Sequence, residues 1–262
     1  MPVLAGVVDR LVSRGHGLLL LAGTSVLEVR AALAAVLACL QDRLPRRALI
    51  GDWVEHESLR TLPAATDGED VPVDLLLQRA LGDDPAVLAL PWLDGIDRAR
   101  AALRQARERV VIAPLDAADA ARAAGRILQV GHGETGGRIE ATDIGILGAR
   151  VMERLCEPCR RPCDPAEILA AAGAGDAVAH GPFFMSEGCS ACRGSGILAL
   201  EPVFEFLDLP AGRGAPADAG GGAWGGRAAP QDATLFHAAL RKAAAGVIDA
   251  REPIRFLLHE QS

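Results

Sequence analysis

The sequence predicts an α/β fold with a mainly parallel sheet, because short apolar runs alternate along the chain with helix-like stretches. Four runs are continuously apolar, which is typical of strands covered on both faces: Leu18–Ala22, Ala48–Ile50, Val87–Leu90 and Val110–Ile112. Four stretches between and after them have helical patterns: Val29–Leu40, Val73–Leu81, Asp97–Glu108 and Ala117–Leu128. Strands that alternate with helices favour parallel strands joined by crossover helices.

The sheet and its helices account for the first part of the chain, and a cysteine-rich region follows. We expect residues 1–150 to form the α/β core. A fifth helix, Ala141–Leu155, is expected to lead directly into the cysteines. Residues 151–209 then form a small separate subdomain.

The remainder of the chain changes composition. Residues 210–232 are rich in Gly, Ala and Pro, which predicts a flexible linker, and we interpret Trp224 as a solvated linker residue rather than a docking anchor. Residues 233–262 have the pattern of two short C-terminal helices, Ala233–Ala244 and Ala250–His259.

The composition excludes some classes of protein. The 262 residues are 50% hydrophobic and 23% charged, which is typical of a globular chain with a core. A net charge of -7 provides no basic field for a phosphate backbone, so we expect no nucleic-acid partner. The N-terminal residues lack a signal-peptide pattern, and the apolar run 17–23 is too short to cross a bilayer. These features predict a cytoplasmic protein without direct membrane insertion.

Four of the six cysteines form a pattern typical of a structural zinc site. Two CxxC pairs, Cys156 with Cys159 and Cys189 with Cys192, are separated by an interval that allows them to close into one tetrahedral site. A closed four-thiolate site leaves no position for water, so its expected role is structural. The alternative is a decayed site without metal, in which the cysteines are reduced or form disulfides. Cys163 is interpreted as a bystander rather than a substitute ligand, and Cys39 as a core residue.

The sequence around these cysteines resembles a known family. Segments 150–159 (RVMERLCEPC) and 188–196 (GCSACRGSG), the latter followed by Glu205, resemble the two halves of the zinc-binding subdomain of type II secretion and type IV pilus assembly ATPases. Segment 238–246 is similar to the C-terminal helical segment of that family. The resemblance implies the family's C-terminal motor domain: a RecA-like P-loop NTPase fold with a zinc-binding subdomain and C-terminal helices. The family's Gly-Tyr-x-Gly-Arg continuation is replaced by residues 196–200 here.

The resemblance places the phosphate loop directly after the run Leu18–Ala22, but its key residues are replaced. A phosphate loop needs glycines that let backbone N–H groups surround the phosphates, a lysine, and a Ser or Thr for Mg²⁺. Gly23 matches the first glycine, but the other positions of the motif hold different residues: Val26 and Glu28 for glycines, Val29 for the lysine and Arg30 for the Ser or Thr. Lys242 is the only lysine in the chain and lies far away in sequence. We interpret the segment as a degenerate phosphate loop and Arg30 as a helix-start residue.

The other motor motifs are also altered. The segment beginning Asp84-Pro85 resembles the Walker B strand, with Trp92 in place of the glutamate that orients water and Asp94 two positions further on. Asp116 stands in place of the histidine of the family's histidine box, whereas Asp52 and Glu55 match its acidic box. A separate GxGxxG pattern at 131–136 follows a predicted helix rather than a strand, so it is interpreted as a turn.

These substitutions lead to a functional hypothesis with two alternatives. We expect a non-catalytic relative of the secretion and pilus ATPases, with bound ATP and Mg²⁺ doubtful and a structural zinc ion retained. Its expected partners are proteins of a secretion or pilus machine, including a competent ATPase paralogue, which would hold it peripherally at the inner membrane. One alternative is an ATPase that binds or slowly hydrolyses ATP through unconventional residues; another is a decaying paralogue. The sequence leaves homo-oligomerisation open.

Overall fold

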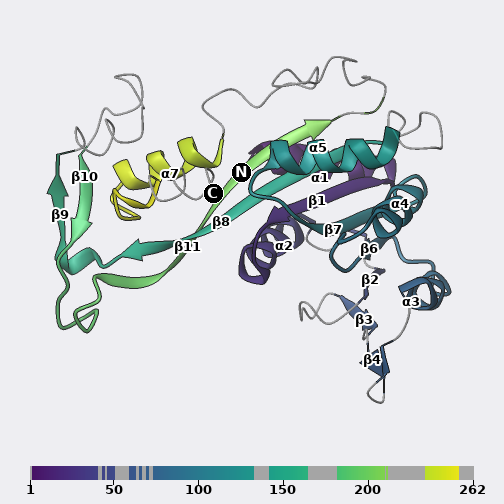
Figure 1. The fold of residues 1–262 in the computed structure, drawn as a ribbon, viewed down its shortest axis with the longest axis horizontal. Helices are drawn as coiled ribbons and strands as arrows, with labels where there is room; N and C mark the ends of the chain where they lie inside the picture. Colours follow the sequence, from purple (N-terminus) through teal and green to yellow (C-terminus); the bar gives the residue numbers. More distant parts are fainter. Residues whose placement is uncertain are drawn as a thin grey trace. The chain divides into compact units, whose positions relative to one another are not determined.

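The computed structural model describes residues 2–40, 43–44, 46–50, 59–62, 65–66, 69–70, 73–132, 142–164, 182–209, 211 and 234–253 (Figure 1). The chain divides into two compact units. Unit 1 comprises Met1–Gly148 and Phe206–Ala229, and unit 2 comprises Ala149–Glu205 and Pro230–Ser262. Among these described residues, no helix combines the length and apolar character that a membrane span requires.

A seven-stranded sheet, with strand order β11-β8-β1-β7-β6-β2-β3, organises unit 1. Its strands are β1 (Gly17–Gly23), β2 (Arg47–Ile50), β3 (Arg60–Leu62), β6 (Val87–Ala89), β7 (Val110–Asp116), β8 (Ile144–Leu155) and β11 (Ile197–Leu209). The ladders from β8 through β3 are parallel, with β1 between β8 and β7. Two very short antiparallel strands, β4 (Ala65–Thr66) and β5 (Glu69–Asp70), form a second sheet.

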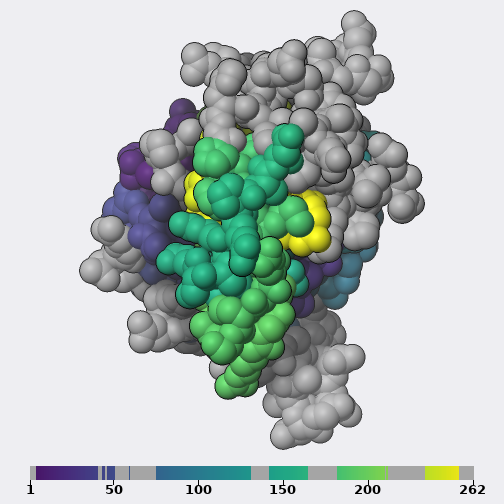
Figure 2. All heavy atoms as spheres, turned by 90° about the vertical axis from the view of Figure 1, so that its left-hand side faces the viewer, coloured from purple at the N-terminus to yellow at the C-terminus, as the bar shows by residue number. Residues whose placement is uncertain are grey.

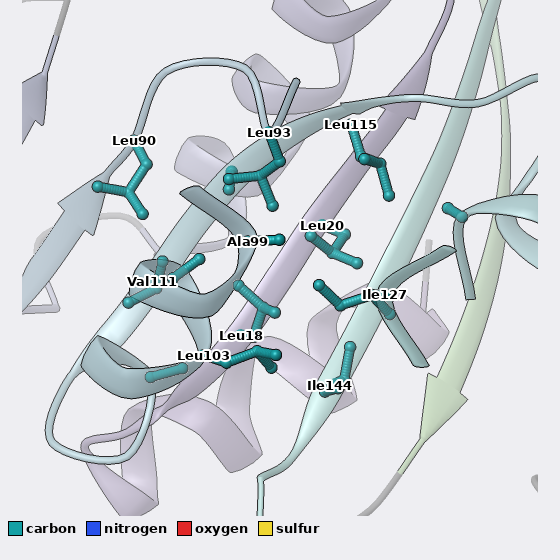
Figure 3. Close-up of a cluster of buried hydrophobic side chains, with 14 of the residues drawn as sticks. Leu18, Leu20, Leu90, Leu93, Ala99, Leu103, Val111, Leu115, Ile127 and Ile144 are labelled. Carbon is teal, nitrogen blue, oxygen red and sulfur yellow. The ribbon is translucent and has the colours of Figure 1, made fainter. Parts of the chain in front are cut away.

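Helices supply the rest of the core of unit 1. They are α1 (Pro2–Arg14), α2 (Val26–Leu40), α3 (Val73–Leu81), α4 (Ile96–Gln105) and α5 (Ala120–His132). On one side of β1, Leu18 and Leu20 pack with Leu103 of α4 and Ile127 of α5 (Figure 3). On the other side, Leu19 and Val7 of α1 both approach Gly145 so closely that a Cβ there would lie 3.0 Å from each. Side chains alternate between faces along a strand, so β1 contributes to the packing on both sides of the sheet.

A buried carboxylate, which the sequence analysis did not identify, ties together three segments of unit 1. The Asp143 side chain is 0% exposed and accepts a hydrogen bond from Arg14 at the end of α1. Its other oxygen accepts from the backbone N–H of Ala211 at 2.9 Å and lies 3.9 Å from Arg10 Nε. Arg10 also pairs with Asp208 of β11. A buried carboxylate is costly unless it is paired in this way.

Unit 2 contains the cysteines and a small core of its own. A 3₁₀ turn (η2, Glu157–Cys159) leads into β9 (Arg160–Cys163), which pairs antiparallel with β10 (Phe183–Ser186). Helix α7 (Leu235–Ala244) packs with Met152, Phe183 and Val203 in one apolar cluster. Figure 2 faces this region and shows the teal residues of β8 and β9 beside the green residues that lead into β11, with α7 in yellow.

The structure confirms the predicted α/β class and the four predicted strands and four helices, with ends that differ by up to four residues. The expected fifth helix, Ala141–Leu155, is wrong, because Ile144–Leu155 is strand β8. Residues 144–149 are buried throughout, and a continuous apolar run does not distinguish a buried strand from a buried helix.

Several expectations concern residues at the margins of the described ranges. Helix α7 lies within the first expected C-terminal helix, whereas most of the second, Ala250–His259, is outside the described residues. The expected linker 210–232 is also outside them except for Ala211, as is most of the GxGxxG pattern. Helix α1 was not anticipated from the sequence.

Candidate phosphate loop and candidate metal centre

The segment that the sequence resemblance assigns to the phosphate loop is a tight strand-to-helix turn. Strand β1 ends at Gly23 and helix α2 begins at Val26, so only Thr24 and Ser25 separate them. A phosphate loop has five residues between its first glycine and its lysine, which surround the phosphates with backbone N–H groups. Because helix α2 already includes three of these five positions, the turn is too short to form such a cradle.

The carboxylate of Glu28 occupies the N-terminus of α2. Its Oε2 accepts hydrogen bonds from Thr24 N at 2.7 Å, Ser25 N at 3.2 Å and Thr24 Oγ1 at 3.1 Å. In return, Glu28 N donates to Ser25 Oγ at 3.3 Å. This reciprocal arrangement is a capping box, and Glu28 is only 8% exposed. The N–H groups that would face a phosphate are therefore bonded to a carboxylate of the chain itself.

Of the other residues assigned to the loop, the only basic one is Arg30, which is exposed on α2. Val29, at the lysine position, is 0% exposed and faces the core. Val26 and Leu27 are 44% and 50% exposed and add apolar side chains to the first turn of α2. The single lysine, Lys242, lies in unit 2, where its Nζ pairs with Glu201 and donates to Pro202 O at 2.9 Å. The contacts of Lys242 are therefore within unit 2 and not at the turn after β1.

The residues at the Walker B and histidine-box positions lie at the carboxyl ends of their strands. Trp92 follows β6 and is half-buried, and its carbonyl accepts from Arg98 at 3.2 Å. The exposed carboxylate of Asp94 accepts from the same guanidinium at 2.8 Å. Asp116 ends β7 directly opposite Gly23 of β1, and its side chain is exposed. The acidic-box residues Asp52 and Glu55 lie outside the described residues.

The four cysteines of the two CxxC pairs come together in unit 2. Their sulfurs all lie within 4.8 Å of one another. Cys156 and Cys189 are 3.7 Å apart, Cys159 and Cys192 are 3.9 Å apart, and Cys189 and Cys192 are 3.8 Å apart. A tetrahedral zinc site with Zn–S bonds of about 2.3 Å has S–S edges of about 3.8 Å. The four thiols are therefore spaced as a metal ion requires.

Local backbone structure brings the sulfurs together. We call each CxxC turn a knuckle: the first contains Cys156 and Cys159, and the second contains Cys189 and Cys192. The first knuckle is a single turn in which Cys159 N donates to Cys156 O at 3.2 Å. In the second knuckle, Gly194 N donates to Cys189 O at 2.8 Å, and Arg193, Gly194 and Gly196 all have positive φ. A Cβ on Gly188 would lie 2.4 Å from Gly194 O, so the approach of these two residues requires glycine.

The four thiols have different electrostatic surroundings. Burial, reinforced by hydrogen bonds with Cys159 and Cys189, raises the pKa of Cys156 to about 12. Burial also raises the pKa of Cys159. Burial alone would raise the pKa of Cys192 as well, but hydrogen bonds from the backbone N–H groups of Cys189 and Gly196 lower it to about 6. Hydrogen bonds to the thiolate therefore outweigh desolvation at Cys192.

The other two cysteines do not join this group. Cys163 lies at the opposite end of β9 from the first knuckle and packs against the apolar cluster of unit 2. Cys39 lies in α2 of unit 1 and is partly buried. Glu205, which belongs to the segment that resembles the family, accepts from Leu235 N at 2.9 Å and thereby caps α7.

No family model matches the sequence, but a curated protein and solved structures are similar to it. The type IV pilus assembly ATPase PilB of Thermus thermophilus is 30% identical over 134 residues, which cover 50% of this chain and 15% of PilB. The X-ray structure of the ATPase DotB of Legionella pneumophila gives a TM-score of 0.54 at 12% identity and covers 98% of this chain and 63% of DotB.

A second solved structure gives a similar result. The ATPase DotB of Yersinia pseudotuberculosis gives a TM-score of 0.55 at 11% identity, over 93% of this chain and 58% of DotB. The chain thus spans less than two thirds of each of these proteins. The chain is thus similar over half of its length to a type IV pilus assembly ATPase, and it shares a RecA-like α/β fold with DotB.

Proposed function

We propose that this chain is a non-catalytic relative of the secretion and pilus ATPases that acts as an interaction or structural component of a secretion or pilus machine. The observation that carries the proposal is the Glu28 carboxylate, which accepts hydrogen bonds from the N–H groups of Thr24 and Ser25. The sequence resemblance assigns the family's phosphate loop to this turn. A triphosphate would have to displace this carboxylate from its hydrogen bonds and would also meet its negative charge.

The lost side chains add to this effect. Phosphoryl transfer depends almost entirely on positioning and on stabilising the charge of the transferred group. Removing one such donor commonly slows a reaction by about 10²–10³-fold. Here the lysine position holds the buried Val29, and Trp92 stands where a glutamate would orient water. These losses together favour a protein that does not turn over ATP.

We further propose that Cys156, Cys159, Cys189 and Cys192 hold a structural zinc ion. Their sulfur spacing fits tetrahedral coordination, and all four positions around the metal would be filled by thiolates. When bound, zinc would supply four bonds that join the two knuckles and would stabilise unit 2. The ion would have no open position for a substrate.

The relationship to PilB suggests where such a protein works. PilB is a type IV pilus assembly ATPase, so we propose that the partners of this chain belong to a pilus or secretion machine. A competent ATPase paralogue is one such partner. The proposed location is the cytoplasm, at the inner membrane through these partners.

An ATPase assay tests the proposal directly. Purified wild-type protein with one zinc per chain is incubated with MgATP, beside an Asp52→Ala variant. We expect no saturable phosphate release from either protein. Saturable, metal-dependent hydrolysis that the Asp52→Ala change abolishes would overturn the proposal and favour the unconventional ATPase.

A pulldown from native cells tests the proposed partners. We expect the tagged wild-type chain to retain components of a secretion or pilus machine. A matched chain with Cys156→Ser and Cys189→Ser tests whether retention needs unit 2 intact. Recovery of no such component by the wild-type chain would contradict the proposed role in a machine.

A further inference from the structure

The two cysteine knuckles meet at a residue that is not itself a metal ligand. We propose that Gly196 is a positioning residue that fixes Cys156 and Cys192 relative to each other for metal binding. This inference rests on the proposed metal site. Gly196 has no side chain, so this role belongs to its backbone N–H and carbonyl groups.

Gly196 contacts both knuckles through its own backbone. Its N–H donates to the sulfur of Cys192 at 3.2 Å, and its carbonyl accepts from the backbone N–H of Cys156 at 2.8 Å. Cys156 belongs to the first knuckle and Cys192 to the second. A shift of Gly196 would therefore move the two halves of the ligand set relative to each other.

The hydrogen bond to sulfur also has an electronic effect. Cys192 accepts a second backbone bond, from Cys189 N at 3.1 Å, so two N–H dipoles point at this sulfur. Metal sites depend on such outer contacts, which orient the ligands and adjust their basicity. Gly196 supplies one of the two contacts to Cys192.

Only glycine fits at this position. Gly196 has φ of +77°, a conformation that residues with a side chain rarely adopt. A Cβ there would lie 2.2 Å from Ser186 Oγ and 3.0 Å from Ser186 Cβ. Ser186 ends strand β10, so the nearest obstacle is a side chain at the end of a paired strand. An added methyl group must therefore displace either Ser186 or the backbone of Gly196.

Gly194 provides a matched control two residues away. It has φ of +82°, but a Cβ there would have no heavy atom within 4 Å. Its N–H donates to the carbonyl of Cys189 rather than to a sulfur. Gly194→Ala therefore imposes similar backbone strain in the same knuckle without the steric displacement. Comparing Gly194→Ala with Gly196→Ala therefore separates the effect of backbone strain at a positive φ from the effect of moving the metal ligands.

The test compares four proteins: wild type, Gly194→Ala, Gly196→Ala and the double variant Gly196→Ala with Ser186→Ala. Zinc affinity is measured by competition with a chromophoric chelator, and the absorption bands of the Co²⁺-substituted protein report coordination geometry. We expect Gly196→Ala to weaken zinc binding by about 10- to 100-fold, the range for lost outer contacts, and to alter the Co²⁺ bands. Gly194→Ala should keep the wild-type bands and bind more tightly than Gly196→Ala.

The double variant checks the steric cause. Ser186→Ala removes the oxygen that the new methyl group would meet at 2.2 Å, so the double variant should regain part of the zinc affinity. Equal affinity and identical Co²⁺ bands in Gly194→Ala and Gly196→Ala would overturn the role of Gly196, as would the absence of any recovery in the double variant. A wild-type chain that binds no metal would instead overturn the proposed metal site, and this inference with it.

Discussion

The turn after β1 in unit 1 and the second cysteine knuckle in unit 2 have the same local design but different consequences. In both, two backbone N–H groups converge on a negatively charged acceptor. The acceptor is the Glu28 carboxylate in unit 1 and the Cys192 sulfur in unit 2. Glu28 engages the N–H groups of Thr24 and Ser25 in a helix cap, whereas Cys192 is one of four thiols that lie within 4.8 Å of one another. The same pair of backbone donors thus serves a helix cap in unit 1 and a cysteine sulfur of the four-thiol cluster in unit 2.

The largest expected effect concerns the ligands of unit 2. Cys189→Ser should reduce zinc from about one ion per chain to nearly none, because structural zinc sites require the full set of ligands. The measurement is metal content after gel filtration, by elemental analysis. Cys163→Ser is the control and should retain the ion, since Cys163 packs in the apolar cluster. Equal zinc content in both variants would contradict the assignment of the ligands.

The next effect tests the internal carboxylate of unit 1. Glu28→Ala removes a charged acceptor from three hydrogen bonds and should lower the free energy of unfolding by about 1–3 kcal/mol. Glu28→Gln, which keeps the size and one acceptor oxygen, should lose less. Urea denaturation followed by circular dichroism measures both. A Glu28→Ala protein as stable as wild type would show that the contact does not hold the turn.

A smaller effect is expected at the other half of the capping box. Ser25→Ala removes the acceptor for Glu28 N and should cost about 0.5–2 kcal/mol of stability, the usual range for an N-cap. Ser25→Asp should restore most of this loss, because Asp also caps helices well. The same denaturation experiment detects the difference. No loss in Ser25→Ala would argue against a capping box.

The smallest effect concerns the single lysine. Lys242→Met removes a half-buried ion pair with Glu201, which is typically worth about 0.2–1 kcal/mol. We expect slightly lower stability and unchanged behaviour toward nucleotide, since Lys242 lies in α7. Nucleotide binding by the wild-type chain that the Lys242→Met change abolished would place this lysine at a phosphate site and contradict the proposal.

Much of unit 1 could be predicted from the sequence because its strands are short, continuous apolar runs bounded by helical patterns. Strand β8 could not, since Ile144, Ile146 and Leu147 are all buried and such a run suits a helix equally well. The buried carboxylate of Asp143 also could not be predicted, because its partners Arg14 and Ala211 are distant in sequence.

The two candidate sites differ in how much the sequence revealed. The cysteine spacing predicted the four residues that lie together, because CxxC turns bring their sulfurs close regardless of the surrounding fold. The sequence shows which residues at this turn differ from a phosphate-loop motif, but the cap formed by Glu28 was not predicted from it. The spacing of Ser25 and Glu28 matches a capping box and could have indicated it. The contacts of Gly196 depend on tertiary structure and had no sequence signal beyond glycine itself.

The central claim is that the turn after β1 does not bind nucleotide. Its most direct test is an isothermal calorimetric titration of the zinc-loaded wild-type chain with MgATP. We expect no saturable heat at millimolar nucleotide, because the N–H groups of Thr24 and Ser25 are bonded to Glu28. Saturable binding that ADP competes away, from protein whose zinc content confirms an intact unit 2, would contradict the account.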